Sequence, residues 1–460
     1  MQRAFDIASL KVTVIGAARS GLAAARLLHR KGVTVYLSEL SPENCHEEAS
    51  AILRSENIPH EFGVHSNRVF DADLIVVSPG VPSDAQVLRE AERRATPVIS
   101  EIEVGAMFVD GPIIAITGTN GKTTTTTLTG DICISSDRET LLGGNIGLAF
   151  TDALLEHKGR IDITVLEISS FQLDTCASFH PTTAVITTIT PDHLNRYHGD
   201  FREYVQSKQR IFMNQGPSDN LIYSCDNPVV VGAIKTASAR LFPVSTLQRL
   251  RKGGWRENGN LLINAGYGNE VVARVEDLRV QGAHNHMNIL MAALATRLEG
   301  IGMDTIRRVV LDFRGVEHRL EFICELDGVI WINDSKATNI DSVVIALRSY
   351  KQPVVLIAGG RDKGAHYDPL LEIVEKQVHT MVLMGEAAER MEKVFSPITR
   401  ITHARDMREA VNIARAAARP GDVAMLSPGC ASFDMFDNFE HRGRVFKECV
   451  RSFCREPMVA

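Results

Sequence analysis

The stretch from Ile113 to Thr124 constrains this chain more than any other, because it joins a strand, a glycine turn and a helix start. Its first five residues are mostly apolar and are typical of a buried parallel strand. Backbone N–H groups of such a turn and the positive end of the next helix bind phosphate. A lysine binds the terminal phosphates, and a threonine hydroxyl binds Mg²⁺. We therefore predict a nucleotide-phosphate site built from Gly118, Thr119, Asn120, Gly121, Lys122, Thr123 and Thr124.

The glycine spacing of this turn differs from that of the usual P-loop. The common pattern G-x-x-x-x-G-K-[ST] would need a glycine at position 116, where the chain has Ile116. The turn is therefore a shorter form with the sequence Gly-Thr-Asn-Gly-Lys-Thr. A turn that only joins a strand to a helix is the competing interpretation, and the lysine and threonines in register favour the phosphate site.

Length, charge and cysteine usage narrow the class of protein. With 460 residues the chain is long enough for about three domains. A net charge of -6 without a basic block argues against nucleic-acid binding. We find no apolar signal segment and no uninterrupted apolar window of about 18 residues, so we expect a cytoplasmic protein without membrane insertion. Eight cysteines without C-x-x-C pairs argue against a zinc ribbon and a disulfide framework.

The first hundred residues predict a β-α-β unit with a ligand site. Strand, helix and strand are expected at Lys11 to Ile15, Leu22 to Lys31 and Val33 to Leu37. Glu39 lies 23 residues after Gly16, which is typical of a dinucleotide site. Ala18 replaces the middle glycine of G-x-G-x-x-G, so the bound nucleotide need not be NAD. A purely structural β-α-β unit is the alternative.

Two predicted strands in the middle of the chain end in residues that could bind a metal ion. Ile161 to Leu166 leads into Glu167, and Thr183 to Ile189 leads into His193. We expect these strands to be adjacent and parallel, which would place a carboxylate and a neutral imidazole beside the phosphates and Mg²⁺. A histidine after a strand is more often structural, and the neighbouring phosphate turn favours the metal site here.

Other polar residues of the central region have two interpretations each. Asn145, in a glycine-rich segment, could orient a ligand or belong to an ordinary loop. Lys208, taken alone, is a solvated lysine on a helix. Asn285 and Asn288 share one face at the start of a helix that runs to Leu298, and they could hold a base or phosphate. Asn285 could instead cap that helix.

After residue 315 the pattern again alternates strands with polar loops. The loops of interest follow four predicted strands and span residues 333–339, 359–364, 385 and 427–433. Polar groups at the carboxyl edge of one parallel sheet form the usual site of such a domain.

Together these motifs resemble the Mur ligases of bacterial peptidoglycan synthesis. The matching segments are Gly118 to Thr124, Glu167 to Leu173, Asp192-His193, His284 to Asn288, His318-Arg319, Asn333 to Asn339, Gly359 to Gly364 and Ser427 to Asp434. The phosphate turn and the Asn-Asp-Ser-x-Ala-Thr-Asn motif are shared with the wider family, which includes folylpolyglutamate synthetase. Ser-Ser-Phe-Gln-Leu, Gly-Gly-x-x-Lys-Gly and Cys-Ala-Ser-Phe-Asp are most similar to the members that add D-glutamate.

The resemblance implies an α/β fold with three domains. These are a Rossmann-like domain for the UDP substrate (1–102), a central P-loop ATPase-type domain with a mainly parallel sheet (103–315), and a C-terminal Rossmann-like domain for the amino acid (316–460). The implied reaction adds D-glutamate to UDP-N-acetylmuramoyl-L-alanine through an acyl phosphate, using ATP and two Mg²⁺ ions. Lys208 would be carbamylated and hold the second ion, and we expect a monomer.

The resemblance also implies roles for single residues. The catalytic residues would be Lys122, His193 and Lys208. ATP would bind the phosphate turn and Asn285, Asn288, Arg319, Asp334 and Lys336. The UDP substrate would bind Arg19, Ser20, Glu39, Gly80, Asn145 and His193. D-Glutamate would bind Thr338, Lys363, Ser427 and Phe433, and Mg²⁺ would bind Thr123, Glu167, His193 and Lys208. Glu39 and Arg19 depart from the family, where an aspartate and a small or apolar residue are expected.

Three alternatives stay open at this point. A ligase of the same family could use a folate or another muramyl peptide. An NAD-dependent oxidoreductase would fit the first β-α-β unit, although Ala18 and the intact phosphate turn count against it. A non-catalytic nucleotide-binding module is disfavoured because Thr123, Glu167, His193 and Lys208 are all present. For the ligase we expect domain closure about hinges near residues 102 and 315.

Overall fold

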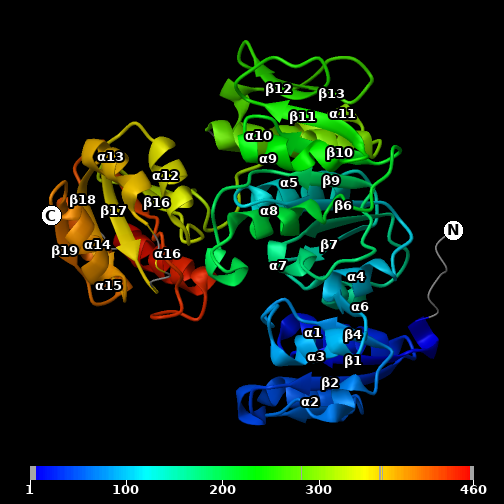
Figure 1. Cartoon of the computed structure of the whole chain (residues 1–460). Helices are drawn as coiled ribbons and strands as arrows, with labels where there is room; N and C mark the ends of the chain where they lie inside the picture. The colour runs from blue at the N-terminus through cyan, green and yellow to red at the C-terminus, as the bar shows by residue number, and fades with distance from the viewer. Residues whose placement is uncertain (1–6, 281, 362–363, 365, 456–460) are drawn as a thin grey trace. The chain divides into compact units, whose positions relative to one another are not determined.

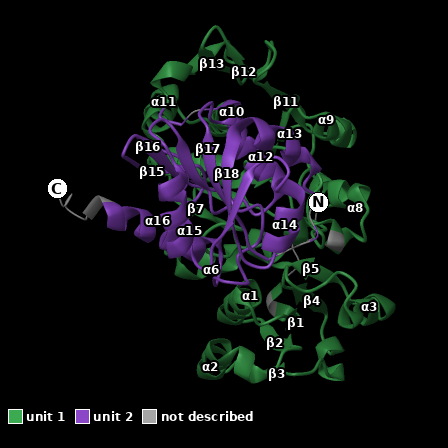
Figure 2. Ribbon diagram, turned by 90° about the vertical axis from the view of Figure 1, so that its left-hand side faces the viewer, with its two compact units in different colours: residues 1–278, 285–313 green, residues 279–284, 314–460 purple. Residues whose placement is uncertain are grey.

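The computed structural model describes residues 7–280, 282–361, 364 and 366–455. Helices and strands alternate over most of these residues, and the strands form three β-sheets (Figure 1). The chain separates into two compact units, residues 1–278 with 285–313 and residues 279–284 with 314–460 (Figure 2). Two sheets belong to the first unit and one to the second. The predicted α/β class is confirmed.

The first sheet has five parallel strands in the order β3-β2-β1-β4-β5. The strands are β1 (Lys11–Ile15), β2 (Thr34–Glu39), β3 (His60–Phe62), β4 (Leu74–Val77) and β5 (Val98–Ser100). The helices are α1 (Arg19–Arg30), α2 (Glu47–Ser55), α3 (Gln86–Arg93) and α4 (Glu101–Ala106). Helix α1 buries Ala24 and Leu28 against this sheet, as its apolar periodicity requires. The predicted β-α-β unit is confirmed, and its helix begins at Arg19 rather than Leu22.

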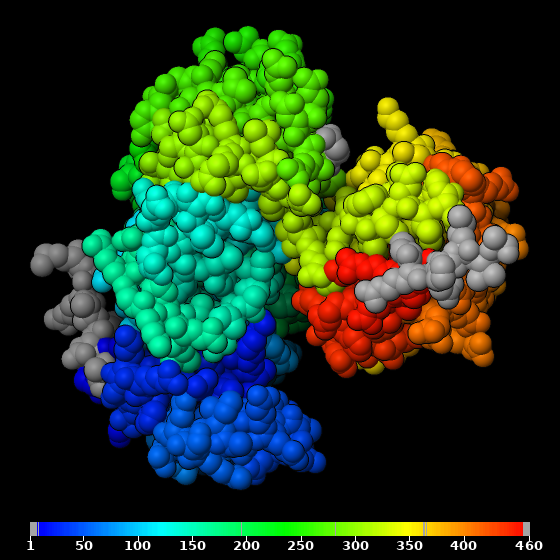
Figure 3. All heavy atoms as spheres, turned by 180° about the vertical axis from the view of Figure 1, so that it is seen from behind, coloured from blue at the N-terminus to red at the C-terminus, as the bar shows by residue number. Residues whose placement is uncertain are grey.

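Helix α4 attaches the first sheet to the central part of the same unit. The Glu101 carboxylate accepts hydrogen bonds from the backbone N–H (2.6 Å) and the hydroxyl (2.8 Å) of Thr151. Glu103 accepts the N–H of Ser178 (2.5 Å), and Ile102 is fully buried between them. The blue and cyan-green parts are in direct contact in Figure 3. Our boundary at residue 102 stays a prediction, and it would fall inside this helix.

The central sheet has nine strands in the order β14-β13-β12-β11-β10-β9-β6-β8-β7. They are β6 (Ile113–Thr117), β7 (Thr140–Gly144), β8 (Ile163–Glu167), β9 (Thr183–Ile186), β10 (Asn220–Ser224), β11 (Arg240–Ser245), β12 (Gly253–Glu257), β13 (Asn260–Asn264) and β14 (Glu270–Arg274). The pairs β12-β13 and β13-β14 are antiparallel and the other pairs are parallel. The prediction of a mainly parallel central sheet is therefore confirmed.

Helices of the central part flank this sheet and carry most of the candidate site. They are α5 (Lys122–Ile134), α6 (Phe150–Glu156), α7 (Ser170–Leu173), the 3-10 helix η4 (Leu194–Tyr197), α8 (Phe201–Gln209), α9 (Pro228–Ala233), α10 (Ala283–Leu298) and α11 (Met303–Asp312). Helix α5 begins with a lysine and five consecutive threonines, which are poor helix formers. Nine of its 13 residues are buried, so tertiary packing rather than local propensity stabilises it.

The order of the central strands corrects one prediction. We expected the strands that end at Glu167 and before His193 to be adjacent. Instead β6 lies between them, paired with β8 on one side and with β9 on the other. The phosphate turn after β6 is therefore flanked by the loops after both strands, because parallel strands end at the same edge of a sheet.

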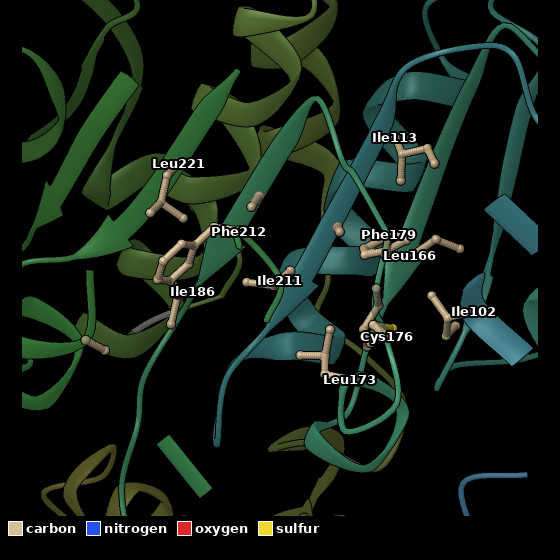
Figure 4. Packing of buried hydrophobic residues seen from close by; sticks show 14 of the residues in the cluster. Ile102, Ile113, Leu166, Leu173, Cys176, Phe179, Ile186, Ile211, Phe212 and Leu221 are labelled. Atoms are coloured by element: carbon tan, nitrogen blue, oxygen red, sulfur yellow. The ribbon is translucent and has the colours of Figure 1, made fainter. Parts of the chain in front are cut away.

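A continuous apolar core fills the space between the central sheet and its helices. Figure 4 shows Leu166, Ile186 and Leu221 on the strands, with Phe212 close to Ile186. All four are at most 3% exposed. Burial of this kind contributes roughly 25 cal/mol per Å² of apolar surface. The strands that present the phosphate turn are thus held in a packed interior.

The third sheet forms the second unit, with strand order β15-β16-β20-β17-β18-β19. Its strands are β15 (Glu321–Leu326), β16 (Val329–Asn333), β17 (Val354–Gly359), β18 (Val378–Met384), β19 (Arg400–His403) and β20 (Val423–Leu426). Its helices are α12 (Ile340–Arg348), α13 (Asp368–Gln377), α14 (Ala388–Phe395), α15 (Met407–Ala417) and α16 (Phe439–Arg455). Only the β15-β16 pair is antiparallel among the pairs of this sheet. The four predicted polar loops follow β16, β20, β17 and β18, which are neighbours.

None of the helices in the described part of the chain combines the length and apolar character that a bilayer span requires.

Candidate functional site

The phosphate turn needs glycine at both of its ends. Gly118 and Gly121 have positive φ angles of 150° and 87°, which side chains rarely tolerate. A Cβ atom at Gly118 would lie 1.9 Å from the Thr187 hydroxyl oxygen, and one at Gly121 would lie 2.5 Å from Asn288 Oδ1. The turn is thus a tightly enclosed backbone cradle at the start of α5, as the sequence predicts.

Threonines that follow β9 hold this turn in place. The Thr119 N–H donates to Thr188 O (2.6 Å), and the Asn120 N–H donates to the Thr188 hydroxyl (3.0 Å). The Thr187 hydroxyl donates to Asn120 O (2.5 Å). Sequence reasoning missed these threonines, because their contact with the turn depends on β9 pairing directly with β6.

Two lysine side chains meet at the turn. Lys122 Nζ donates to the carbonyl oxygens of Gly118 and Thr119, both at 2.9 Å. Lys208 Nζ, from α8, donates to Gly118 O at 2.8 Å and is 1% exposed. Burial lowers the pKa of Lys208 well below its usual value, and the positive charge of Lys122 lowers it further. Lys208 is therefore no solvated surface lysine.

Tyr204 contacts both the phosphate turn and Lys208, and sequence reasoning missed it. Its hydroxyl lies 3.0 Å from Thr119 Oγ1, and Lys208 Nζ lies 4.5 Å from the centre of its ring. Tyr204 is four residues before Lys208 on α8, so the two share one helix face. That spacing is the signal that could have identified it.

Glu167 ends strand β8 beside the turn, as predicted, and is 1% exposed. Asn145 Nδ2 donates to Glu167 Oε1 (2.8 Å), and the Asn145 N–H donates to Glu167 O (2.8 Å). Asn145 thus orients this carboxylate, and its contact with a ligand stays a prediction. Thr123 lies in the first turn of α5 and is buried.

His193 lies on the loop between β9 and η4 in a left-handed backbone conformation, with φ of 53°. Its side chain is 41% exposed, and its ring packs edge-on against Phe171 with centroids 4.9 Å apart. Asp192, its neighbour, lies close enough to Lys208 to raise the pKa of that amine, against the larger lowering by burial.

Helix α10 presents Asn288 to the back of the phosphate turn. The Thr125 hydroxyl donates to Asn288 Oδ1 (3.3 Å), and Asn288 is 4% exposed. Asn285 is the third residue of α10, so it lies within the first turn and does not occupy the cap position. The predicted common face of Asn285 and Asn288 is confirmed by their spacing on this helix.

A cavity of about 1020 Å³ opens between the first sheet and the loop after β7. Its lining includes five residues that we predict to bind the UDP substrate, namely Arg19, Ser20, Glu39, Gly80 and Asn145. His193 is not among the lining residues. The cavity is large enough for a nucleotide-linked ligand, since ligand sites usually measure about 300–1,000 Å³.

Glu39 and Arg19 both line this cavity, and each is held by hydrogen bonds. Glu39 accepts the N–H groups of Ala17 and Ser41, each at 2.8 Å. Burial opposes ionisation of Glu39, but these N–H bonds outweigh it and keep its pKa below the usual value. Arg19 Nη1 donates to Gly147 O (2.8 Å), so it ties the start of α1 to the loop after β7.

In the second unit, Asp334 follows β16 and is the centre of a second buried cluster. Its carboxylate accepts hydrogen bonds from the Ser427 hydroxyl (2.8 Å) and the Leu320 N–H (3.2 Å). Burial raises the pKa of Asp334 to about 7, although Ser427 and the nearby Arg319 charge lower it. Arg319 and Asp334 line a small cleft together with His284, Leu320, Ala337, Ser342 and Ile345.

The predicted acceptor residues of this unit differ in exposure. The Ser427 side chain is fully buried against Asp334, whereas Phe433 is 63% exposed. Thr338 is half-buried on the loop after β16, and Lys336 Nζ lies 5.2 Å from the Phe439 ring centre. Lys363 lies outside the described residues.

Arg442 is a buried cation that sequence reasoning missed. Its guanidinium donates to Ser335 O (2.8 Å) and to the Cys430 carbonyl (3.2 Å), and the residue is 2% exposed. It therefore ties the loop after β16 to the loop after β20. The sequence of helix α16 does not indicate this role, because an arginine in a helix is usually a surface residue.

In the described part of the chain, one group has donor atoms close enough together for a metal ion, namely Glu317, His318 and Glu321. Lys447 Nζ already pairs with both carboxylates of this group. We therefore interpret it as an ion-pair cluster and assign no metal to it.

Sequence identity to curated relatives shows to which family the chain belongs. The chain is 42% identical to UDP-N-acetylmuramoylalanine–D-glutamate ligase of Salinibacter ruber, over 97% of this chain and 99% of the relative. It is 43% identical to the protein of the same name from Chloroherpeton thalassium, over 97% of this chain and 98% of the relative. The chain belongs to the Mur ligase family. This confirms the resemblance and rules out the oxidoreductase alternative.

Family profiles and a solved structure agree with this membership. Profiles of the Mur ligase MurD-like N-terminal domain, the Mur ligase middle domain and the Mur ligase glutamate ligase domain match residues 10–100, 116–296 and 318–430. The crystal structure of UDP-N-acetylmuramate-alanine ligase from Thermotoga maritima is similar in fold, with a TM-score of 0.58 at 19% identity over 96% of this chain and 100% of that one. The three-domain Mur ligase fold is thereby confirmed.

Proposed function

We propose that this chain is an ATP-dependent ligase that joins the amine of D-glutamate to the carboxylate of UDP-N-acetylmuramoyl-L-alanine in peptidoglycan synthesis. The observation that carries this proposal is the identity of 42% or more, over nearly the whole chain, to curated relatives with that name. The enclosed phosphate turn and the large cavity of the same unit support the proposal, because the reaction needs sites for a triphosphate and for a nucleotide-linked carboxylate.

In the proposed reaction, the substrate carboxylate attacks the γ-phosphorus of ATP and forms an acyl phosphate and ADP. The amine of D-glutamate then attacks the acyl carbon, and the tetrahedral intermediate expels phosphate. The N–H groups of the turn and the Lys122 amine stabilise the charge that develops on the phosphates. Catalysis of this kind depends mainly on positioning and charge stabilisation, which a rigid cradle supplies.

Thr123, Glu167, His193 and Lys208 are the residues that we propose to hold Mg²⁺. Glu167 and Thr123 fit the ion, because a buried carboxylate and a hydroxyl beside the phosphate cradle are hard oxygen donors. When bound, Mg²⁺ screens the negative charges of the two reacting groups from each other. Lys208 as an amine is a poor donor for this ion; carbamylation would convert it into a carboxylate-type ligand, and its lowered pKa favours the neutral form that can be carbamylated.

The cavity of the first unit is our proposed site for the UDP portion of the substrate. Arg19, Ser20 and the following residues begin helix α1 at its wall, where backbone N–H groups favour phosphates. The nearby Glu39 carboxylate stays ionised and is suited to accept hydrogen bonds from a sugar or base.

For the second unit we propose binding of the ATP nucleoside and of D-glutamate. Arg319, Asp334 and Lys336 are proposed ATP contacts, and Thr338, Lys363, Ser427 and Phe433 are proposed acceptor contacts. The burial of Ser427 against Asp334 makes it less accessible than the proposed acceptor contacts Thr338 and Phe433. A cation such as Lys363 suits an acceptor with two carboxylates.

Phosphate release from ATP, measured with UDP-N-acetylmuramoyl-L-alanine and a panel of acceptors, tests the proposal. The panel contains D-glutamate, L-glutamate, glycine, L-lysine and no acceptor, with a parallel series that offers a folate substrate. We expect release to require D-glutamate. Release that depends on a different acceptor, or on folate, would overturn the substrate assignment while leaving the family membership in place.

A further inference from the structure

Arg196 connects three segments of the first unit that lie far apart in the sequence. It belongs to η4, and its backbone N–H donates to His193 O at 3.0 Å. Its side chain is only 16% exposed. The arginine therefore lies under the loop that carries His193 and points into the protein.

The first contact of its guanidinium is with the cavity wall. Arg196 Nη2 donates to the carbonyl oxygen of Val81 at 3.2 Å. Val81 and its neighbour Gly80 line the cavity, and the Val81 N–H donates to Ser78 O at 3.0 Å. Ser78 also lines the cavity, and its hydroxyl is buried without a hydrogen-bond partner among the described residues. A ligand that contacts this wall would therefore affect the position of the Val81 carbonyl, to which Arg196 donates.

The second contact is with the aromatic ring beneath His193. The Arg196 guanidinium lies 4.4 Å from the centre of the Phe171 ring, and the His193 ring packs against the same ring at 4.9 Å. Asp174 Oδ2 lies 3.5 Å from Arg196 Nε and neutralises the cation. Stacking and a planar fork of donors are properties of arginine that lysine lacks.

We propose that Arg196 is a positioning residue that couples occupation of the cavity to the placement of His193. This coupling rests on the proposed function, in which the cavity holds the UDP portion and His193 lies near the reacting carboxylate. Through Arg196, the Gly80-Val81 wall, the Phe171 ring and the His193 loop form one connected set of contacts. Binding of the UDP portion thereby fixes the His193 loop before the chemical step.

Arg196→Ala tests this coupling, with Arg196→Lys as the conservative variant. We expect Arg196→Ala to raise the KM for UDP-N-acetylmuramoyl-L-alanine about tenfold, the effect of losing one good polar contact, while the KM for ATP changes less than twofold. Arg196→Lys keeps one donor for Val81 O but loses the planar stacking, so we expect an intermediate KM. Arg202→Ala, an exposed arginine on the adjacent helix α8, is the matched control and should change neither constant.

A second measurement does not depend on activity. The ring resonances of His193, assigned by comparison with His193→Gln, are followed by NMR while UDP-N-acetylmuramoyl-L-alanine, or UDP alone, is added. We expect the ligand to shift them in the unaltered protein and in Arg202→Ala, and the shift to be lost in Arg196→Ala. A shift that persists in Arg196→Ala, or equal increases in both KM values, would overturn the inference.

The failure of the inference can be told apart from failure of the proposed function. If the unaltered protein forms no D-glutamyl product, the proposed function fails, whereas the response of His193 to UDP still reports on the coupling. If Arg196→Ala does not fold, as judged by its thermal unfolding midpoint, the same two measurements on Arg196→Lys decide the matter. If Arg196→Lys then has the same KM values and the same His193 shift as the unaltered protein, the role of the planar guanidinium is rejected.

Discussion

The amines of Lys122 and Lys208 donate to one and the same atom, the carbonyl oxygen of Gly118, over 2.9 and 2.8 Å. Two cations this close disfavour each other's charged form, and the buried amine bears the larger desolvation cost. The pKa of Lys208 is accordingly lowered well below its usual value. The site thus pairs the Lys122 cation with a second amine, that of Lys208, whose neutral form is favoured.

Lys208→Arg tests whether a neutral amine is needed at this position. Arginine stays charged in proteins and cannot be carbamylated, so we expect kcat to fall by about 100-fold or more. ¹³C NMR of the unaltered protein in ¹³C-bicarbonate should show a carbamate signal that the variant lacks. A variant with normal turnover would reject the role of Lys208 as a metal ligand.

Lys122→Ala removes the cation that we propose to bind the terminal phosphates. Because we propose that its charge stabilises the transition state, we expect kcat to fall by roughly 100- to 1,000-fold while the thermal unfolding midpoint stays nearly constant. Lys158→Ala, at an exposed lysine after α6, is the control and should keep full activity. Near-normal product formation by Lys122→Ala would refute the assigned role of the turn.

Tyr204→Phe removes a single hydroxyl and keeps the ring beside Lys208. The lost hydrogen bond to Thr119 should lower stability by about 1 kcal/mol and loosen the turn, so that kcat falls several-fold with a smaller change in KM for D-glutamate. Urea unfolding and steady-state kinetics measure the two effects. Unchanged kinetics would show that the Tyr204 hydroxyl does not contribute to catalysis.

Lys363→Ala tests the proposed acceptor site. If Lys363 pairs with a carboxylate of D-glutamate, its loss should raise the KM for D-glutamate by about tenfold and leave the KM for ATP nearly unchanged. Steady-state kinetics with each substrate varied in turn give the comparison. Equal effects on both constants would reject the assignment.

Glu101→Gln tests the junction between the first sheet and the central part. Burial raises the pKa of Glu101 to about 7, so the folded protein binds this proton more tightly than the unfolded chain does. The free energy of unfolding should therefore decrease as the pH rises from about 4.5 to 7, by up to roughly 3 kcal/mol, and the Gln variant should lack this decrease. Urea unfolding at pH 5 and pH 8 measures the difference. An identical pH dependence in both proteins, with the exposed Glu156→Gln as control, would contradict it.

Much of the site could be predicted from the sequence because its elements are local. The phosphate turn joins a strand to a helix within twelve residues, and its glycines, lysine and threonines carry the chemistry in consecutive positions. Five of the six predicted UDP-site residues line one cavity because each lies at or just after the end of a parallel strand, or at the start of the helix that follows.

The remaining features depend on contacts between segments that are distant in the sequence. Neighbouring strands along the chain need not be neighbours in a sheet, so the position of β6 between β8 and β9 was missed, and with it the role of Thr187. Arg442 binds carbonyl groups on two loops, and backbone acceptors leave no trace in a sequence. Ser427 carries a suitable hydroxyl, but its burial against Asp334 shows only in three dimensions.

The most direct test of the account follows an oxygen atom. UDP-N-acetylmuramoyl-L-alanine labelled with ¹⁸O in its carboxylate is incubated with the protein, ATP, Mg²⁺ and D-glutamate, and the phosphate and product are analysed by mass spectrometry. The account predicts one ¹⁸O atom in each phosphate released and a product that is heavier by one glutamyl residue. Phosphate without ¹⁸O, or no glutamyl product, would contradict activation of this carboxylate by ATP.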